Sequence, residues 1–113
     1  MTAVAQVLRA AADLLEKPGA WTKGYYARDK HGTMVEPDDP RAVCWCASGA
    51  IMRVARGVAW VRAADAIIPA LPAYWQTRQY VPDWNDSRHR TQAEVVAALR
   101  RAADLVEAGE RGK

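Results

Sequence analysis

Two segments close to the ends of the chain, residues 8–16 and 99–107, match almost residue for residue as LRAAADLLE and LRRAADLVE. In and around both segments, leucine, alanine and valine recur at the spacing of one face of an α-helix. The pattern predicts helices at about residues 3–17 and 92–108, and with them a mainly α fold. Because the match is too short to indicate a duplicated domain, we interpret it as two helices that present the same apolar face to the core and lie side by side.

Both terminal helices have recognisable end signals. Thr2 is a candidate N-cap of the first helix, which the residues Lys17-Pro18-Gly19 end. Thr91 and Glu94 have the spacing of a capping box at the start of the last helix. In each helix an arginine is followed four residues later by an aspartate, and we expect these two residues to form an exposed pair within the helix.

A further helix is predicted between Asp39 and Gly57. Asp39 can accept hydrogen bonds from the free N–H groups at a helix start, Pro40 suits the first helical position, and Gly57 suits a left-handed end. Helical spacing then gathers one apolar face, made of Val43, Ala47, Ala50, Ile51 and Val54 with Cys44 at its border. The sequence therefore predicts a helix at about residues 40–56, buried at the centre of the fold.

Small residues form a seam along this predicted helix, namely Ala42, Cys46, Gly49 and Ala50. A glycine inside a helix costs about 0.5–1 kcal/mol relative to alanine, so we expect another group to approach closely at Gly49. Either a tightly packed helix or a ligand could make that approach. Cys44 and Cys46 would project about 200° apart on a helix, which predicts two reduced thiols and no disulfide between them.

The fold class predicted for the chain is a mainly α single domain spanning residues 1–113, with four to five helices around a buried central helix. A small β-hairpin is expected after the first helix, because aromatic residues there precede a turn at residues 29–32 with glycine at its end. The remaining elements are a hairpin at about residues 21–36, a helix at about 58–68, a short helical turn at about 72–78 and an ordered loop at 80–90.

The charge balance and the hydropathy pattern limit the possible functions. The 113 residues include 16 basic and 13 acidic side chains, and the net charge of +3 is too small to indicate a nucleic-acid-binding protein by itself. No apolar run has the length of a membrane span, and the N-terminal residues lack the pattern of a signal peptide. We therefore expect a cytoplasmic protein that does not contact membranes.

A thiol-dependent enzyme is one functional alternative, with Cys46 as nucleophile, His89 as base and Asp86 as its orienting carboxylate. Cysteine nucleophiles need such a neighbour to form the thiolate. Cys44 is expected to lie in the core, and no motif of a known thiol enzyme surrounds Cys46. The histidines and cysteines match no standard ligand spacing, so we predict neither a metal nor a cofactor.

Weak nucleic-acid binding is a second alternative. It would use Arg88 and Arg90 together with Arg100 and Arg101, with His89 nearby and aromatic rings to stack on bases. The pattern lacks a recognition helix and a glycine-bearing basic loop, so a solvated basic rim is the simpler interpretation.

The residues Trp84-Asn85-Asp86 are the most distinctive polar element. Asn85 and Asp86 can hydrogen-bond to the backbone of their own loop or cap a neighbouring helix, which is a common structural role. They could instead line a polar pocket beneath Trp84. We expect this element to pack near Cys46 and Gly49, as a packing junction or as a binding site.

The chain resembles a family of small uncharacterised proteins of bacteria and their phages, a domain of unknown function. The resemblance rests on Trp45-Cys46 followed by Gly49-Ala50, and on Trp84-Asn85-Asp86 followed by Arg90-Thr91 and Glu94-Val95. It implies that Cys46, Gly49, Asn85 and Asp86 belong to one shared feature. The favoured function is a non-enzymatic binding protein whose partner is another protein, and the resemblance extends this to a modulator of a host or defence protein.

Overall fold

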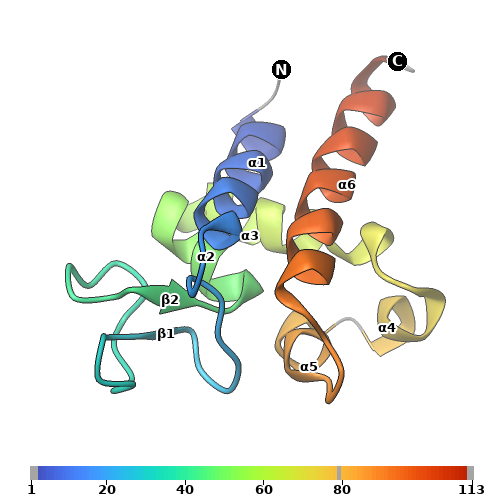
Figure 1. Cartoon of the computed structure of the whole chain (residues 1–113). Coiled ribbons are helices and arrows are strands. Elements are labelled where there is room, and N and C mark those ends of the chain that lie inside the picture. Colours follow the sequence, from blue (N-terminus) through green and yellow to red (C-terminus); the bar gives the residue numbers. More distant parts are fainter. Residues whose placement is uncertain (1–2, 79, 112–113) are drawn as a thin grey trace.

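The computed structural model describes residues 3–78 and 80–111. Its longest helices, α1 (Ala3–Glu16) and α6 (Gln92–Arg111), lie side by side and antiparallel, so that the start of α1 and the end of α6 are together (Figure 1). These bounds confirm the terminal helices predicted from the sequence. The predicted N-cap Thr2 lies outside the described residues.

The pair formed by α1 and α6 buries the apolar faces that the sequence pattern predicted. Thr91 also begins α6 as predicted, because its backbone N–H donates to Glu94 Oε1 at 2.9 Å and its Oγ1 accepts from the backbone N–H of Glu94 at 3.2 Å. The buried residues of the two helices are Ala5, Leu8, Ala11, Ala12 and Leu15 of α1 and Val95, Val96, Ala98, Leu99, Ala102 and Ala103 of α6.

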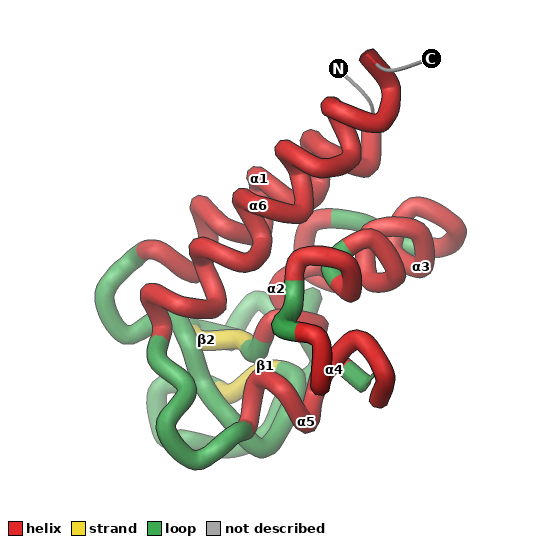
Figure 2. The backbone as a smooth tube through the Cα atoms, turned by 90° about the vertical axis from the view of Figure 1, so that its right-hand side faces the viewer, coloured by secondary structure: helices red, strands yellow, loops and turns green. Residues whose placement is uncertain are grey.

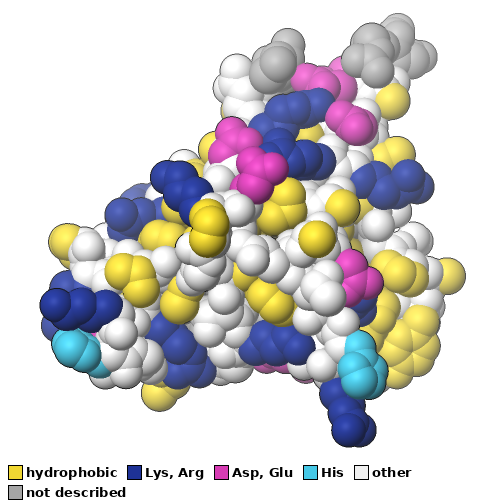
Figure 3. All heavy atoms as spheres, in the orientation of Figure 1, with side chains coloured by type: hydrophobic (Ala, Val, Ile, Leu, Met, Phe, Trp, Pro, Cys, Tyr) yellow, Lys and Arg dark blue, Asp and Glu magenta, His cyan; other side chains and the backbone are white. Residues whose placement is uncertain are grey.

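The repeated arginine and acidic residues pair between the two helices. The cross-helix pairs are Arg9 with Asp104 and Glu107, and Arg100 with Asp13 and Glu16, at 2.7 to 3.2 Å. The prediction of a pair within each helix is therefore wrong, because antiparallel packing brings each arginine to the acids of the other helix. Figure 3 shows the alternating basic and acidic side chains over this part of the surface.

The central helix is shorter than predicted. The helix expected at residues 40–56 is α2 (Ala47–Val54), because Asp39 accepts the N–H of Arg41 at 2.8 Å and closes a turn instead of capping a helix. The residues before α2 form β2 (Cys44–Trp45), which pairs antiparallel with β1 (Ala27–Arg28). Burial of Trp45 and these long-range hydrogen bonds outweigh the local helix signals.

This change of structure exposes residues that the helical pattern assigned to the core. Val43 is 49% exposed and Val54 is 36% exposed, and Cys44 is half-buried on β2. Gly57 has the expected left-handed backbone, with φ of +60°, but it starts α3 (Gly57–Ala66) and does not end the central helix. Both cysteines are free thiols, as predicted.

The small antiparallel pair lies after the first helix, as expected, although its second strand comes from a different segment. In the hairpin predicted at residues 21–36, the second strand would follow the turn at residues 29–32. Residues 33–35 instead contribute a bridge of Met34 to Arg28 and two backbone hydrogen bonds, from Asp29 N to Thr33 O at 2.9 Å and from Val35 N to Ala27 O at 3.1 Å. The two strands lie below the pair of α1 and α6 (Figure 2). The mainly α fold class is confirmed.

The short helices η1 (Ile68–Ala70), α4 (Ala73–Arg78) and α5 (Val81–Asp86) connect α3 to α6. The prediction of a loop at residues 80–90 is wrong for its first half, where α5 forms. Pro82 lies in the first turn of α5, and the buried residues Val81, Trp84 and Asn85 have the spacing i, i+3 and i+4. Val81 and Trp84, three residues apart around Pro82, were the sequence signal for this helix.

Candidate functional site

Asn85 is the centre of a buried hydrogen-bonded junction that joins three segments. Its side chain is fully buried, and its Oδ1 accepts hydrogen bonds from Trp21 Nε1 at 2.8 Å and from the backbone N–H of Ala47 at 2.9 Å. Its Nδ2 donates to Thr22 O at 3.1 Å and to Asp86 Oδ1 at 3.0 Å. One amide group therefore connects the segment after α1, the start of α2 and α5.

Neighbouring polar contacts also join the segment after α1 to α5 and to the residues that follow α5. Asp86 Oδ1 also accepts from the backbone N–H of Gly24 at 3.0 Å, and Lys23 Nζ donates to Ser87 O at 2.8 Å. Trp84 is 2% exposed, and the guanidinium of Arg90 lies 4.8 Å from the centre of its ring. The structure thus brings the Trp84-Asn85-Asp86 element next to Cys46, as the sequence suggested.

Cys46 caps α2 in the folded protein. Its Sγ accepts a hydrogen bond from the backbone N–H of Gly49 at 3.3 Å, and the residue is 4% exposed. Burial raises the pKa of the Cys46 thiol to about 11, and the charge of Asp86 acts in the same direction. The thiol is therefore protonated at neutral pH, which is the opposite of what a cysteine nucleophile needs.

Gly49 allows a close backbone approach, as its place in a helix predicted, but the approaching group is a loop. A Cβ built at Gly49 would lie 1.9 Å from the backbone oxygen of Tyr26. That same oxygen accepts the N–H of Cys46 at 3.2 Å. Ala42 lies outside α2, so the seam of small residues predicted along a longer helix does not form, and the space over Gly49 is filled by the Tyr26 backbone.

The structure places the other two residues of the enzyme alternative differently. Asp86 contributes its charge to the surroundings of Cys46, whereas His89 is exposed in the turn before α6. Figure 3 shows the two histidines of the chain at separate places on the surface. Within residues 3–78 and 80–111, no group of three or more histidine, cysteine or acidic side chains is arranged to hold a metal ion.

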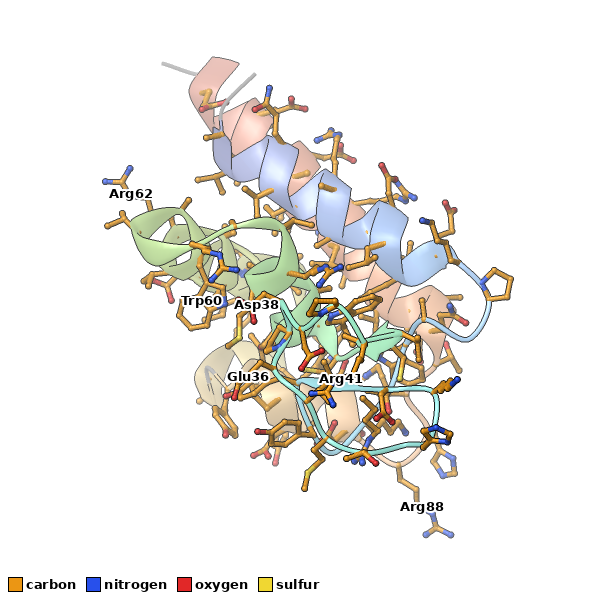
Figure 4. The ribbon with its side chains drawn as sticks, turned by 90° about the vertical axis from the view of Figure 1, so that its left-hand side faces the viewer. Glu36, Asp38, Arg41, Trp60, Arg62 and Arg88 are labelled. Carbon is orange, nitrogen blue, oxygen red and sulfur yellow. The ribbon has the colours of Figure 1, made fainter. Side chains whose placement is uncertain are left out.

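Two of the four arginines of the nucleic-acid alternative make contacts within the fold. Arg90 Nε donates to Trp84 O at 3.0 Å, and Arg100 pairs with acidic residues of α1. Arg88 and Arg101 are exposed, and Figure 4 shows Arg88 pointing away from the molecule. The basic residues therefore do not form one continuous free patch.

Replacing Cys46 by serine is expected to change the free energy of unfolding by less than about 1 kcal/mol at neutral pH, since serine is also a good N-cap. The raised pKa means that the thiol contributes stability below about pH 8.5, the usual cysteine value, and that this contribution is lost as the pH rises towards about 11. Urea unfolding at a series of pH values is expected to show a steeper decline for the wild type than for Cys46→Ser. Parallel curves of unfolding free energy against pH would contradict the raised pKa of the Cys46 thiol.

The surface beside the junction carries a groove made of three adjoining hollows. The first, of about 240 Å³, is lined by residues of the loop before β1 and of α5, with Cys46 between them. It shares Tyr26, Tyr80 and Pro82 with a second hollow of about 220 Å³, which shares Met52 and Trp60 with a third of about 360 Å³. We call this surface the acidic groove. Its further lining residues are Gly24, Tyr25, Glu36, Pro37, Asp38, Ser48, Ala55, Arg56, Gly57, Ala64, Asp65, Ile68, Val81, Asp83 and Asp86.

The charges of the acidic groove are opposite to those of the whole chain. Among the described residues, its lining includes five carboxylate residues and one cationic residue, Arg56, which pairs with Asp38. This ion pair holds the pKa of the Asp38 carboxyl below its usual value. Figure 4 shows Glu36, Asp38 and Trp60 on one side of the molecule, with Arg62 extending away from them.

Sequence reasoning identified only one end of the acidic groove. Of the residues singled out from the sequence, Cys46 and Asp86 line it, whereas Gly49, Trp84 and Asn85 belong to the packing beneath. The missed residues include Trp60, Met52, Tyr80 and Glu36. Aromatic residues and acids at these separate positions carry no common spacing, so the tertiary fold alone assembles them.

Comparisons with known proteins add one finding. The family of unknown function DUF6197 matches residues 1–105. No curated protein and no solved structure matches the chain. None of the helices in the described ranges combines the length and the apolar character that crossing a membrane requires. The chain therefore belongs to DUF6197, a family of unknown function, in agreement with the resemblance noted from its two tryptophan-containing motifs.

Proposed function

We propose that this protein is a non-enzymatic binding module that recognises another protein through the acidic groove. The observation that supports this most strongly is the composition of the groove. Tyrosine, tryptophan and methionine are enriched where proteins bind proteins, and the groove contains Tyr25, Tyr26, Tyr80, Trp60 and Met52. Tyr80 is 53% exposed and Tyr26 is 37% exposed, so both rings are available to a partner.

The scaffold beneath the groove favours binding over catalysis. Gly24, Cys46 and Asp86, which line one end, are held by the hydrogen bonds of the junction around Asn85. A surface fixed in this way loses little conformational entropy when a partner docks. The protonated Cys46 thiol offers no nucleophile at neutral pH, which supports a role without covalent chemistry.

The proposed setting is the cytoplasm of a bacterial cell or of a cell infected by a phage, with a host or defence protein as the partner. This part of the proposal is supported by the family resemblance of the two motifs. The net charge of +3 and the free thiols are compatible with a cytoplasmic protein.

A site-specific cross-linking experiment tests the proposed surface. A photo-reactive phenylalanine analogue is placed at Tyr80 in the groove or at Tyr74 on α4, which is 64% exposed and lies outside the groove lining. Exposed to an extract of the natural host, the protein is expected to cross-link one partner from position 80 and none from position 74. Equal cross-linking from both positions would contradict the proposal.

The partner identified in this way is then purified for a binding measurement. Tyr80→Ala is expected to raise the Kd by about tenfold or more, because truncating an aromatic residue at the centre of an interface commonly costs more than about 1 kcal/mol. Tyr74→Ala serves as the matched control and is expected to leave the Kd within about twofold. An unchanged Kd for Tyr80→Ala would place the interface elsewhere.

A further inference from the structure

We propose that the occupant of the acidic groove is an extended, basic segment of the partner protein, which places lysine or arginine side chains in successive hollows. This inference rests on the proposed function and names the chemistry of its ligand. It is supported by the charge, the shape and the aromatic lining of the groove.

The charge of the groove selects a cationic ligand. Among the described residues, the lining includes five carboxylates, those of Glu36, Asp38, Asp65, Asp83 and Asp86, and one guanidinium, so these residues sum to a formal charge of −4. The whole chain carries +3. This concentration of negative charge on a basic protein attracts basic segments and repels acidic segments and nucleic-acid phosphates.

The shape of the groove favours an extended segment over a compact molecule. Its three hollows follow one another and share lining residues at each boundary, with volumes of about 240, 220 and 360 Å³. In an extended chain, alternate side chains point to the same side. A segment lying along the groove could therefore place side chains from alternate positions into the separate hollows.

The aromatic residues provide binding positions for cationic side chains. Lysine and arginine are attracted to the faces of tryptophan and tyrosine rings, and arginine also stacks on them. The third hollow combines the ring of Trp60 with the carboxylate of Glu36, and the first combines tyrosines with Asp83 and Asp86. We assign the third hollow as the main position for a basic side chain, because it is the largest of the three and contains Trp60, and tryptophan is the aromatic side chain that attracts cations most strongly.

Synthetic peptides test this inference independently of the natural partner. The probes are peptides of alternating serine and arginine, alternating serine and glutamate, and alternating serine and glutamine, together with the single amino-acid derivative N-acetylarginine amide. Binding is followed by ¹H–¹⁵N NMR, using the indole N–H of Trp60 and the backbone amides of Gly24 and Gly57 as reporters of the groove.

The arginine peptide is expected to shift the groove resonances and to bind about tenfold or more tightly than the glutamine peptide, with an affinity that falls as salt rises. The glutamate peptide is expected to cause no shifts. N-acetylarginine amide is expected to bind much more weakly than the arginine peptide, because it occupies one hollow only. Equal binding of the single derivative would contradict an extended ligand, and equal binding of the glutamine peptide would contradict charge selection.

Charge variants provide a second readout. The double variant Glu36→Gln and Asp65→Asn is expected to raise the Kd for the arginine peptide by about tenfold or more at low salt. Glu110→Gln on α6 is the control and is expected to leave this Kd unchanged. If the arginine peptide does not shift the groove resonances but the natural partner cross-links at position 80, the basic-segment inference fails and the proposed function stands. If the peptide binds but no partner cross-links there, the proposed function fails by itself.

Discussion

Replacing Gly49 by alanine is expected to lower the free energy of unfolding by about 3–5 kcal/mol, a large share of the stability of a domain of this size. The added Cβ would lie 1.9 Å from the backbone oxygen and 2.7 Å from the carbonyl carbon of Tyr26. Because both atoms belong to the backbone, no side-chain rotation relieves the overlap. The loop must move away from α2, which breaks the hydrogen bond from Cys46 N to Tyr26 O.

Gly109 provides a matched control for this substitution. It also lies within a helix, α6, but a Cβ built there meets no atom of the described residues within 4 Å. Gly109→Ala is expected to raise the free energy of unfolding by about 0.5–1 kcal/mol through helix propensity alone. Urea unfolding followed by circular dichroism measures both variants. A Gly49→Ala variant as stable as the wild type would show that the Tyr26 loop is not packed against α2.

Replacing Asn85 by alanine is expected to destabilise the protein by about 3–5 kcal/mol, since it leaves several buried polar groups without a partner. The Nε1–H of Trp21 and the backbone N–H of Ala47 lose their acceptor, and Thr22 O loses a donor. Each unpaired buried group costs about 1–3 kcal/mol. Chemical denaturation measures the loss, and the near-ultraviolet circular dichroism of Trp21 is expected to change with it.

The variant Asn85→Asp keeps the volume of the side chain, so it tests the effect of the hydrogen bonds and of charge on stability separately from the effect of volume. It keeps the acceptor for Trp21 and Ala47 but removes the Nδ2 donor and adds a buried negative charge beside Asp86. Burial and the neighbouring charge are expected to raise the pKa of the new carboxyl above its usual value of about 3.9. Stability relative to the wild type is therefore expected to be greatest below about pH 4 and to fall as the pH rises through that raised pKa.

Asp86→Asn is the control for this pH dependence. The residue is exposed, and an amide oxygen can replace the carboxylate as acceptor for the N–H of Gly24. We expect a loss of less than about 1 kcal/mol and no additional pH dependence near neutrality. If Asn85→Asp also proves as stable as the wild type at neutral pH, Asn85 does not form the buried junction.

The terminal helices could be predicted because their signals are local. Apolar residues at helical spacing, the capping box of Thr91 and Glu94, and the Pro18-Gly19 end are all read within one segment. Their repeated arginine and acidic residues were identified but given the wrong partners. A helix sequence shows which residues share a face, and it does not show which neighbour that face meets.

The central segment shows where local signals fail. Asp39 and Pro40 suit a helix start and a turn equally well, since both use the aspartate side chain as an acceptor for nearby backbone N–H groups. The contacts of Trp45 determine that this segment forms a turn and a strand. Its backbone pairs with Ala20 and Thr22, and its indole donates to Pro37 O at 2.9 Å. These contacts link residues distant in the sequence, so the local pattern does not contain them.

Some features of the candidate site were also predicted from local sequence, and others were formed by long-range contacts. The sequence by itself predicted that Gly49 needed a close neighbour and that Asn85 and Asp86 would hydrogen-bond to nearby backbone or cap a helix, because the chemistry of a glycine in a helix and of these polar side chains is local. Only the tertiary structure decided that the neighbour is the Tyr26 backbone, and that Trp60, Tyr80 and five carboxylates line one groove. Backbone pairing and core burial draw these segments together, and neither leaves a periodic signal in the residues that consequently meet at the surface.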